Sequence, residues 1–196
     1  AYTRGNGKVG GDISYIVPHL KIPRKINKRG RVILRSEGLF SKGAFLKYAK
    51  EFDSSRNEAS GIMNRQEIHR SVKDLSVVII QVLEPNAKPI QSLAWAKTQG
   101  FTVVPFKVFK AKDLNGSNLD SFLSLRKAKS KYALDGIVLT EDKVNRQPTN
   151  GNPDWSIAFK TNISVLSAPV TTVTEIEWNV SAHGIIQPTV IYKGVL

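Results

Sequence analysis

The amino-acid sequence predicts an α+β fold, and three observations lead to this class. Apolar, β-branched stretches typical of strands occur among stretches whose apolar residues recur at helical spacing. The two kinds of element do not follow the regular strand–helix–strand order of a doubly wound sheet. The chain has 196 residues, 41% of them hydrophobic, which is enough for one large domain or for a domain and part of a second.

In the first hundred residues, local composition predicts two strands and two helices. Valine and isoleucine content predicts the strands, and apolar spacing predicts the helices. Pro89 is favourable at the start of a helix, and Gly100 stops it. A loop is expected to open at Asp53. The expected elements are a strand over 32–34 that delivers Arg35 and Glu37, a helix over 43–52, a buried strand over 76–83 and a helix over 89–99.

In the second half, strands predominate. Ser117 is expected to cap an amphipathic helix that runs to about Tyr132. The segment 145–154 is rich in asparagine, proline and glycine, so a loop is expected there. The remaining apolar runs predict strands over 101–109, 136–140, 156–160, 170–180 and 189–192.

The charge balance points to a polyanionic partner. Lysine and arginine total 29 against 16 aspartates and glutamates, for a net charge of +13. Basic side chains placed on phosphates release condensed counterions, which favours nucleic-acid binding. Pro23 and Gly30 indicate that the most basic segment is a loop or hairpin, which either lies on a phosphate backbone or is simply solvated. Its basic residues are Lys21, Arg24, Lys25, Lys28, Arg29 and Arg31.

Composition also excludes several kinds of site. The chain has no cysteine, so disulfides, thiolate nucleophiles and cysteine-ligated zinc are ruled out within it. The three histidines have no metal-ligand spacing. No apolar run approaches the roughly 20 residues of a membrane helix, and the first residues do not resemble a signal peptide. An intracellular, cytoplasmic protein with no membrane partner is therefore expected.

Six short motifs carry the chemistry, and each is weak alone. A lysine at a strand end, such as Lys160, is usually a solvent-exposed cap, and Asp135-Gly136 is by itself a common turn. In order, the motifs are TRGNG (3–7), RSEG (35–38), SRNEASG (55–61), LDGIVLT (134–140), WSIAFK (155–160) and EIEWNVSAHG (175–184). Together, in this order, they resemble the nucleotidyltransferase core of NAD-dependent DNA ligases, and the last motif resembles the start of the ligase OB-fold.

The resemblance implies a domain organisation. Residues 1–162 would form the nucleotidyltransferase (adenylation-domain) fold of covalent ligases, and residues 163–196 the first strands of an OB-fold. The family attaches AMP to the lysine of a Lys-x-Asp-Gly motif, and the 196 residues contain none. The adenylation fold is therefore expected to be incomplete at its N-terminus. A split ligase, a truncated fragment and a relic that only binds nucleic acid all fit this expectation.

The resemblance also implies roles for single residues. Lys160 would meet the α-phosphate of AMP, and Glu37 and Asp135 would contact ribose or Mg²⁺, so these three are the expected catalytic residues. Arg4 and Arg56 would contact phosphate or adenosine. Thr140 and Asn64 stand where the family has basic residues. Arg65, which is next to Asn64, is expected to contact DNA in place of the family's arginine at position 64.

The implied activity is the sealing of nicks in double-stranded DNA. AMP would come from NAD with Mg²⁺ as cofactor, and the reaction would pass through AMP-lysine and AMP-DNA intermediates. A second polypeptide would supply the nucleophilic lysine. The alternative is a catalytically inactive nucleic-acid-binding protein on a ligase scaffold.

Overall fold

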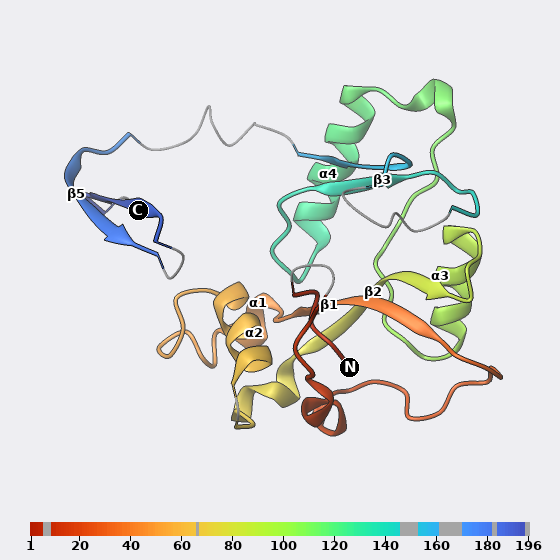
Figure 1. The fold of residues 1–196 in the computed structure, drawn as a ribbon. Coiled ribbons are helices and arrows are strands. Elements are labelled where there is room, and N and C mark those ends of the chain that lie inside the picture. Colours follow the sequence, from red (N-terminus) through yellow and green to blue (C-terminus); the bar gives the residue numbers. More distant parts are fainter. Residues whose placement is uncertain (6–8, 66, 146–152, 161–169, 182–183, 195–196) are drawn as a thin grey trace. The chain divides into compact units, whose positions relative to one another are not determined.

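The computed structural model describes residues 1–5, 9–65, 67–145, 153–160, 170–181 and 184–194. The chain divides into two compact units, Ala1–Lys160 and Thr161–Leu196. The sheets within these units are two-stranded and antiparallel, and helices accompany them in the larger unit (Figure 1). The mixed α and β character predicted from the sequence is therefore confirmed.

One sheet of the larger unit pairs β1 (Ile33–Leu39) with β2 (Ser76–Glu84). Helix α3 (Pro89–Thr98) packs on β2 through Leu93 and Ala96, which are buried. Pro89 begins this helix, as the sequence predicts, because its fixed φ suits the first turn and its missing N–H has no partner to lose there. Strand β1 is longer than expected, so Glu37 lies inside the strand, paired with Val78.

The main apolar core lies beneath helix α2 (Ser55–Asn64). Ala59 and Ile62 lie three residues apart on its inner face and meet residues from two 3₁₀ helices, η1 (Ser14–His19) and η2 (Arg70–Asp74). Full burial of a side chain such as Ile62, which is 2% exposed, stabilises the fold by about 1.5–3 kcal/mol. This core fixes α2, and with it Arg56 in the first helical turn.

A second sheet pairs β3 (Ile137–Thr140) with β4 (Ser156–Phe159), and both strands were predicted. Helix α4 (Gly116–Lys129) precedes them, after the short 3₁₀ helix η3 (Ala111–Asp113). Asn115 caps α4 by accepting a hydrogen bond from Asn118 N at 3.0 Å, two residues before the expected cap. The loop expected over 145–154 lies largely outside the described residues.

Three expectations are wrong. The helix expected over 43–52 is only α1 (Lys42–Phe45); the turns after it use bonds of three-residue span, such as Tyr48 N to Phe45 O at 2.8 Å. The loop expected after Asp53 is instead helix α2, because Ser54 accepts a hydrogen bond from Asn57 N and caps it. The segment 101–109 forms no strand beyond one bridge at Val103, and Pro105 explains this by removing a backbone donor.

The smaller unit contains a hairpin of β5 (Val173–Val180) and β6 (Ile186–Tyr192). Its register puts apolar residues opposite one another on one face, because side chains alternate along a strand. These pairs are Ile176 with Val190, Trp178 with Pro188, and Val180 with Ile186. Within the described residues of this unit, nothing covers that face, and Trp178 is 67% exposed.

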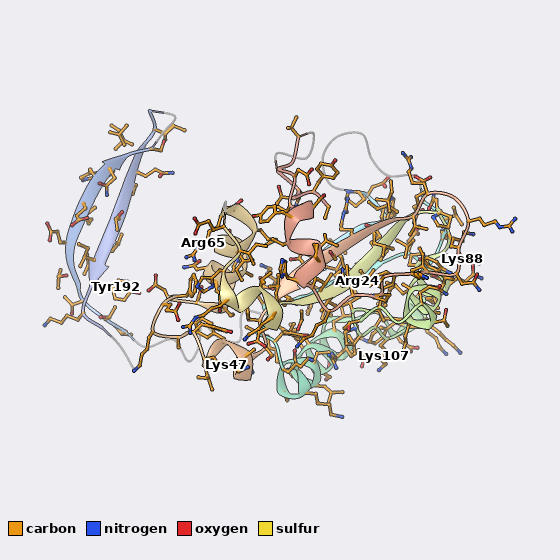
Figure 2. All side chains as sticks on the ribbon, turned by 90° about the horizontal axis from the view of Figure 1, so that it is seen from below. Arg24, Lys47, Arg65, Lys88, Lys107 and Tyr192 are labelled. Carbon is orange, nitrogen blue, oxygen red and sulfur yellow. The ribbon has the colours of Figure 1, made fainter. Side chains whose placement is uncertain are left out.

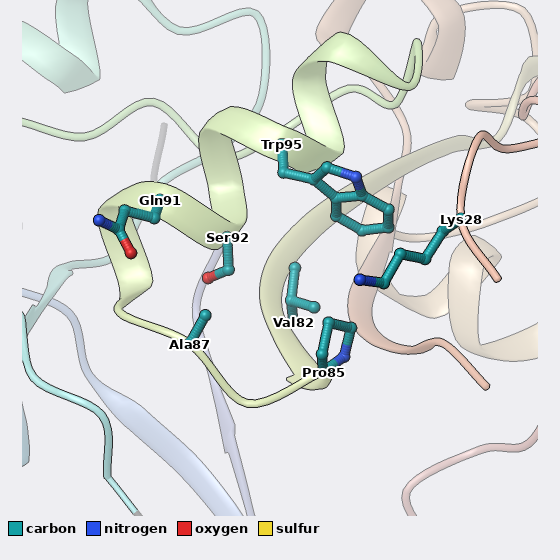
Figure 3. A pocket seen from close by; sticks show the side chains of 7 residues that line it. All are labelled: Lys28, Val82, Pro85, Ala87, Gln91, Ser92 and Trp95. Carbon is teal, nitrogen blue, oxygen red and sulfur yellow. The ribbon is translucent and has the colours of Figure 1, made fainter. Parts of the chain in front are cut away.

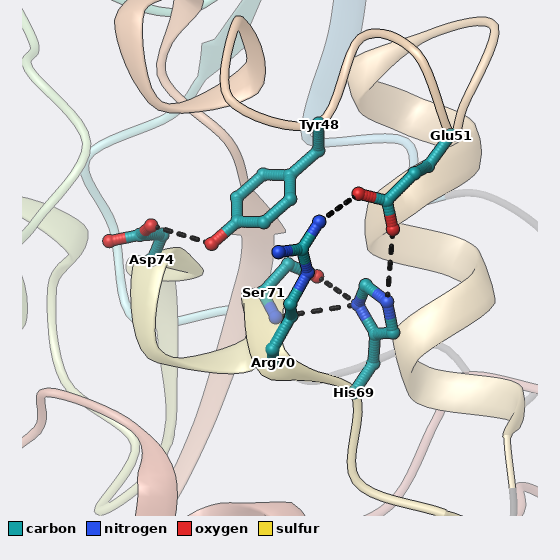
Figure 4. Close-up of polar contacts among 6 residues, drawn as sticks. All are labelled: Tyr48, Glu51, His69, Arg70, Ser71 and Asp74. Carbon is teal, nitrogen blue, oxygen red and sulfur yellow. Dashed lines mark hydrogen bonds and ion pairs between the residues drawn. The ribbon is translucent and has the colours of Figure 1, made fainter.

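Figure 4 shows a polar network beside α2. Arg70 forms an ion pair with Glu51, and Glu51 Oε2 also lies 3.4 Å from His69 Nε2. The amide of Ser71 donates a hydrogen bond to His69 Nδ1 at 3.3 Å, and the other ring nitrogen, Nε2, faces Glu51. This network surrounds a carboxyl group of the core.

That carboxyl belongs to Glu58, which is fully buried in α2. Neither of its oxygens has a hydrogen-bond partner of good geometry within the described residues. Burial raises the pKa of Glu58; the nearby Ser71 hydroxyl opposes this shift, and the charges of Glu51 and Asp74 reinforce it. The folded chain therefore keeps this proton to a higher pH than the unfolded chain, which releases it near pH 4.5.

Replacement of Glu58 by glutamine should stabilise the chain increasingly as the pH rises above the ordinary glutamate value of 4.5. Below that value both states of the wild type are protonated. Between that value and the raised pKa of the folded chain only the unfolded state ionises, which favours unfolding by about 1.4 kcal/mol for each unit of pKa difference; above the folded pKa the difference levels off. Urea unfolding of wild type and variant between pH 4 and pH 8 measures the difference. Glu58→Met, which also lacks the titrating group, should give the same pH trend; a pH-independent difference would contradict the assignment.

Candidate functional site

The pairing of β3 with β4 creates a charged pair at one end of the second sheet. Ile137 lies opposite Phe159, so the residues just outside the strands, Asp135 and Lys160, come together. Lys160 Nζ donates a hydrogen bond to Asp135 Oδ2 at 3.0 Å. The two side chains are 62% and 79% exposed, so a ligand can reach both groups.

Gly136 makes this close approach of the two strands possible. A Cβ at this position would lie 2.7 Å from Phe159 O and 2.9 Å from Lys160 Cγ, which is closer than real Cβ atoms come. A glycine is therefore needed beside the aspartate, and the pair Asp135-Gly136 has a steric reason beyond turn formation.

The pKa of Asp135 responds mainly to Lys160 and, to a smaller extent, to Arg56. The hydrogen bond from Lys160 is the main reason why the pKa of Asp135 lies below its ordinary value; desolvation opposes the shift, and the charges of Lys160 and Arg56 support it. Arg56 comes from the first turn of α2, far away in the sequence. The structure therefore brings two of the predicted site residues, Lys160 and the ionised Asp135, into direct contact, and the charge of Arg56 has a smaller effect on the carboxylate.

Glu37 and Arg4 are not joined to this pair by a direct contact within the described residues. Glu37 projects from the middle of β1 and is exposed, and its neighbour Arg35 donates to Gln81 Oε1 at 3.1 Å. Arg4 is exposed, two residues after Tyr2, which bridges to Asp12 and so folds the N-terminal segment back on itself. Their roles stay predictions.

Val138 is a residue that the motifs alone did not single out. Val138 pairs with Ala158 on the neighbouring strand. Because side chains alternate along a strand, it lies on the same face as Gly136 and on the opposite face from Ile137 and Leu139. Its exposed fraction is 67%, which is high for a β-branched residue in an apolar strand. The sequence signal for an exposed apolar residue was the run of three apolar residues in a short strand, because a strand with one buried face needs an apolar residue only at every second position.

The metal ligands expected at this site were Glu37 and Asp135. Within the described residues, no group of three histidine, cysteine, aspartate or glutamate side chains is arranged to hold a metal ion. Mg²⁺ on a nucleotide commonly takes only one or two carboxylates, because phosphate oxygens and water supply the rest. An exposed, ionised Asp135 fits that requirement.

The basic segment 21–31 contains both structural and free cations. Arg24, labelled in Figure 2, is one of the structural cations. It donates to the carbonyl oxygens of Val17, Pro18 and Leu20 at 2.7–3.1 Å, and so closes the end of η1. Arg31 pairs with Glu84 at 2.7 Å. The other predicted DNA contacts of this segment are exposed and take part in no ion pair within the described residues: Lys21, Lys25, Lys28 and Arg29.

Two of the predicted DNA contacts, Lys28 and Arg65, lie near aromatic rings. Lys28 and Trp95 line a hollow of about 210 Å³ between the end of β2 and α3, together with Val82 and Pro85 (Figure 3). Arg65 follows α2 directly, and its guanidinium lies 5.2 Å from the centre of the Phe52 ring. A cation held over a ring face in this way keeps its charge available to solvent on the other side.

Among the described residues, none of the helices is long and apolar enough to span a membrane.

Comparison with known proteins gives consistent results. Residues 1–163 match the family model of the NAD-dependent DNA ligase adenylation domain. The chain is 31% identical over 199 residues to a DNA ligase of Acanthamoeba polyphaga mimivirus, covering 99% of this chain and 30% of that protein. DNA ligases of Clostridium perfringens and Lactobacillus delbrueckii subsp. bulgaricus are 28% and 30% identical over 98% and 100% of the chain, and in each it spans 31% of the relative.

Proposed function

This chain belongs to the family of NAD-dependent DNA ligase adenylation domains, and from that premise we propose that it binds the AMP part of NAD during the sealing of nicked DNA. One observation carries the proposal: the exposed side chains of Lys160 and Asp135 are in direct contact, although they come from separate parts of the sequence. This is the charge distribution that a phosphate bound with a divalent cation requires.

Lys160 would act on the α-phosphate. When a nucleophilic lysine attacks this phosphorus, the bond to the nicotinamide mononucleotide half breaks, and negative charge grows on the phosphate oxygens. The ammonium of Lys160 stabilises that charge. The bond to Asp135 at 3.0 Å is an exposed ion pair worth under about 1 kcal/mol, so an arriving phosphate can displace the carboxylate.

Asp135 and Glu37 would hold Mg²⁺ and the ribose. The lowered pKa of Asp135 means that its carboxylate is ionised at neutral pH, as a metal ligand must be. Bound Mg²⁺ would neutralise phosphate charge in the transition state. Arg4 and Arg56 would contact phosphate or adenosine, and the exposed Val138 offers an apolar surface for the base on the strand face of Gly136.

The lysine that receives AMP would come from outside these 196 residues, since they contain no Lys-x-Asp-Gly motif. We propose a second polypeptide as its source. Residues 163–196, which include the β5–β6 hairpin, would form the first strands of an OB-fold, because two strands with one bare apolar face need further strands to be stable.

The decisive experiment mixes this chain with a polypeptide that carries the Lys-x-Asp-Gly motif, NAD and Mg²⁺. The proposal requires an AMP adduct on that polypeptide, detected as a mass increase, and the sealing of a nicked duplex. The net charge of +13 favours one alternative, a protein that binds nucleic acid without catalysis. Binding of the duplex without any adduct would establish that alternative instead.

Binding of nicked duplex should weaken steeply with salt. If the four free cations of the segment 21–31 each neutralise a phosphate, the slope of log affinity against log salt should be about −3.6 from this segment alone. Fluorescence anisotropy with a labelled duplex at several salt concentrations measures it. Replacing Lys25 by glutamine should make the slope less steep by about 0.9, whereas an unchanged slope would remove this residue from the interface.

A further inference from the structure

A hollow of about 300 Å³ in the larger unit has no role in the adenylation site, because none of Lys160, Asp135, Arg56, Glu37 or Arg4 lines it. It lies where the start of β2 meets the segment before β3. Two backbone hydrogen bonds connect its walls: Lys42 N to Lys131 O at 2.8 Å, and Ile79 N to Thr102 O at 2.8 Å. Its shape is therefore set by backbone bonds as well as by side chains.

Three lysines from separate segments line the hollow: Lys21, Lys73 and Lys131. Within the described residues, none of the three takes part in an ion pair. Like charges repel one another when no anion lies between them. Here three segments each place a lysine at one hollow, and none of these lysines is paired with a carboxylate. This arrangement is suited to binding an anion.

Asp74 is the one carboxylate among the lining residues, and it is already occupied. It accepts hydrogen bonds from Lys47 Nζ at 3.1 Å and from Tyr48 Oη at 2.9 Å, the latter drawn in Figure 4. Burial alone would raise the pKa of Asp74, but these two hydrogen bonds and the charges of Lys47 and Lys21 hold it below its ordinary value. Its charge is thus balanced locally by Lys47, which leaves the hollow positive.

The hydroxyl of Tyr132 gives a second, independent indication. Tyr132 lines the hollow, and its Oη is buried with no hydrogen-bond partner within the described residues. Buried hydroxyls without partners are rare in folded proteins. Ser41, Ser76 and Thr102 add further hydroxyl-bearing side chains to the lining. Hydroxyl donors together with ammonium groups are what a tetrahedral oxyanion accepts.

We propose that this hollow binds one phosphoryl group, held by the charges of Lys21, Lys73 and Lys131 and by a hydrogen bond from Tyr132 Oη. The phosphoryl group belongs either to a nucleic-acid backbone or to a free nucleotide, since both present the same oxygen atoms. The site does not involve Lys160 and so does not rest on the proposed AMP transfer; of the predicted duplex contacts it shares only Lys21.

The test titrates the chain with inorganic phosphate at constant ionic strength and follows backbone amide shifts by NMR. We expect saturable shifts at Ser41, Lys73 and Tyr132. Lys73→Gln and Tyr132→Phe should each weaken phosphate binding about fivefold, the effect of one lost contact at a partly exposed site. Lys97→Gln, which changes an exposed lysine on α3 outside the hollow, should have no effect.

Tyr132→Phe separates ligand binding from folding. The hydroxyl has no partner in the described structure, so its removal should leave the unfolding midpoint unchanged or raise it while phosphate binding falls. Shifts that do not saturate, or equal binding by Lys73→Gln and Lys97→Gln, would overturn the proposal.

A second pair of titrations identifies the source of the phosphoryl group. If it is a nucleic-acid backbone, Lys73→Gln should weaken duplex binding and make its salt slope less steep by about 0.9. If it is a free nucleotide, Lys73→Gln should bind the duplex as tightly as Lys97→Gln does. Lys73→Gln should then bind ADP more weakly than Lys97→Gln does. Loss of AMP transfer with normal phosphate binding would count against the proposed function alone.

Discussion

Replacing Lys160 with alanine should reduce AMP transfer by at least about 10²–10³-fold, the effect of removing one preorganised group that stabilises transition-state charge. Lys160 is the cation in direct contact with the Asp135 carboxylate, and the proposed reaction places the phosphate at that contact. The measurement is the rate at which the Lys-x-Asp-Gly polypeptide gains AMP from NAD. The unfolding midpoint should change little, because the lysine is 62% exposed.

Lys143→Ala is the matched control for this variant. Lys143 also ends near a carboxylate, Glu141 at 3.2 Å, and it is 71% exposed, but it has no assigned role. Both variants lose one exposed ion pair, so only a specific role at the phosphate distinguishes them. Equal rates for Lys160→Ala and Lys143→Ala would disprove the role of Lys160. Lys160→Arg, which keeps the charge, should retain part of the activity.

Replacing Gly136 with alanine should both destabilise the chain and slow AMP transfer. The new Cβ would meet Phe159 O at 2.7 Å, and a backbone atom of a paired strand cannot move aside without disturbing the ladder. Overpacking of this kind typically costs about 1–3 kcal/mol. Because Lys160 Cγ lies at 2.9 Å from the same position, the lysine should be displaced from Asp135. Urea unfolding and the adenylation rate measure the two effects.

Gly43→Ala provides the comparison, since it makes the same chemical change where there is room. Nothing lies within 4 Å of a Cβ built at Gly43, and the residue is in helix α1. Alanine should be neutral or slightly stabilising there. If Gly136→Ala were as stable and as active as Gly43→Ala, the close approach of the two strands would not explain the glycine.

The elements that sequence predicted correctly are those in which local preference and burial agree. Strand β2 has valine and isoleucine in a run, and α3 has proline at its start, so no distant contact is needed to choose their conformation. The segment over 43–52 is different. Its apolar spacing suits a helix, but the chain turns after Phe45 so that Tyr48 enters the core, and only the folded core reveals that.

The candidate site shows the same division. The contact of Asp135 with Lys160 follows from pairing two predicted strands, so it was accessible to sequence reasoning once their register is known. The effect of the Arg56 charge on Asp135 was not, because the motif that carries Arg56 was expected to be a loop. Its position depends on the packing of Ala59 and Ile62 under α2. Likewise, sequence could not reveal that Arg24 closes η1.

The bare apolar face of the β5–β6 hairpin gives the chain a spectroscopic reporter. Trp178 lies on that face and is 67% exposed, whereas Trp95 and Trp155 are half-buried. Indole emission moves to shorter wavelength when water leaves the ring. A blue shift that Trp178→Phe eliminates would therefore report when another segment covers the hairpin, without any added dye.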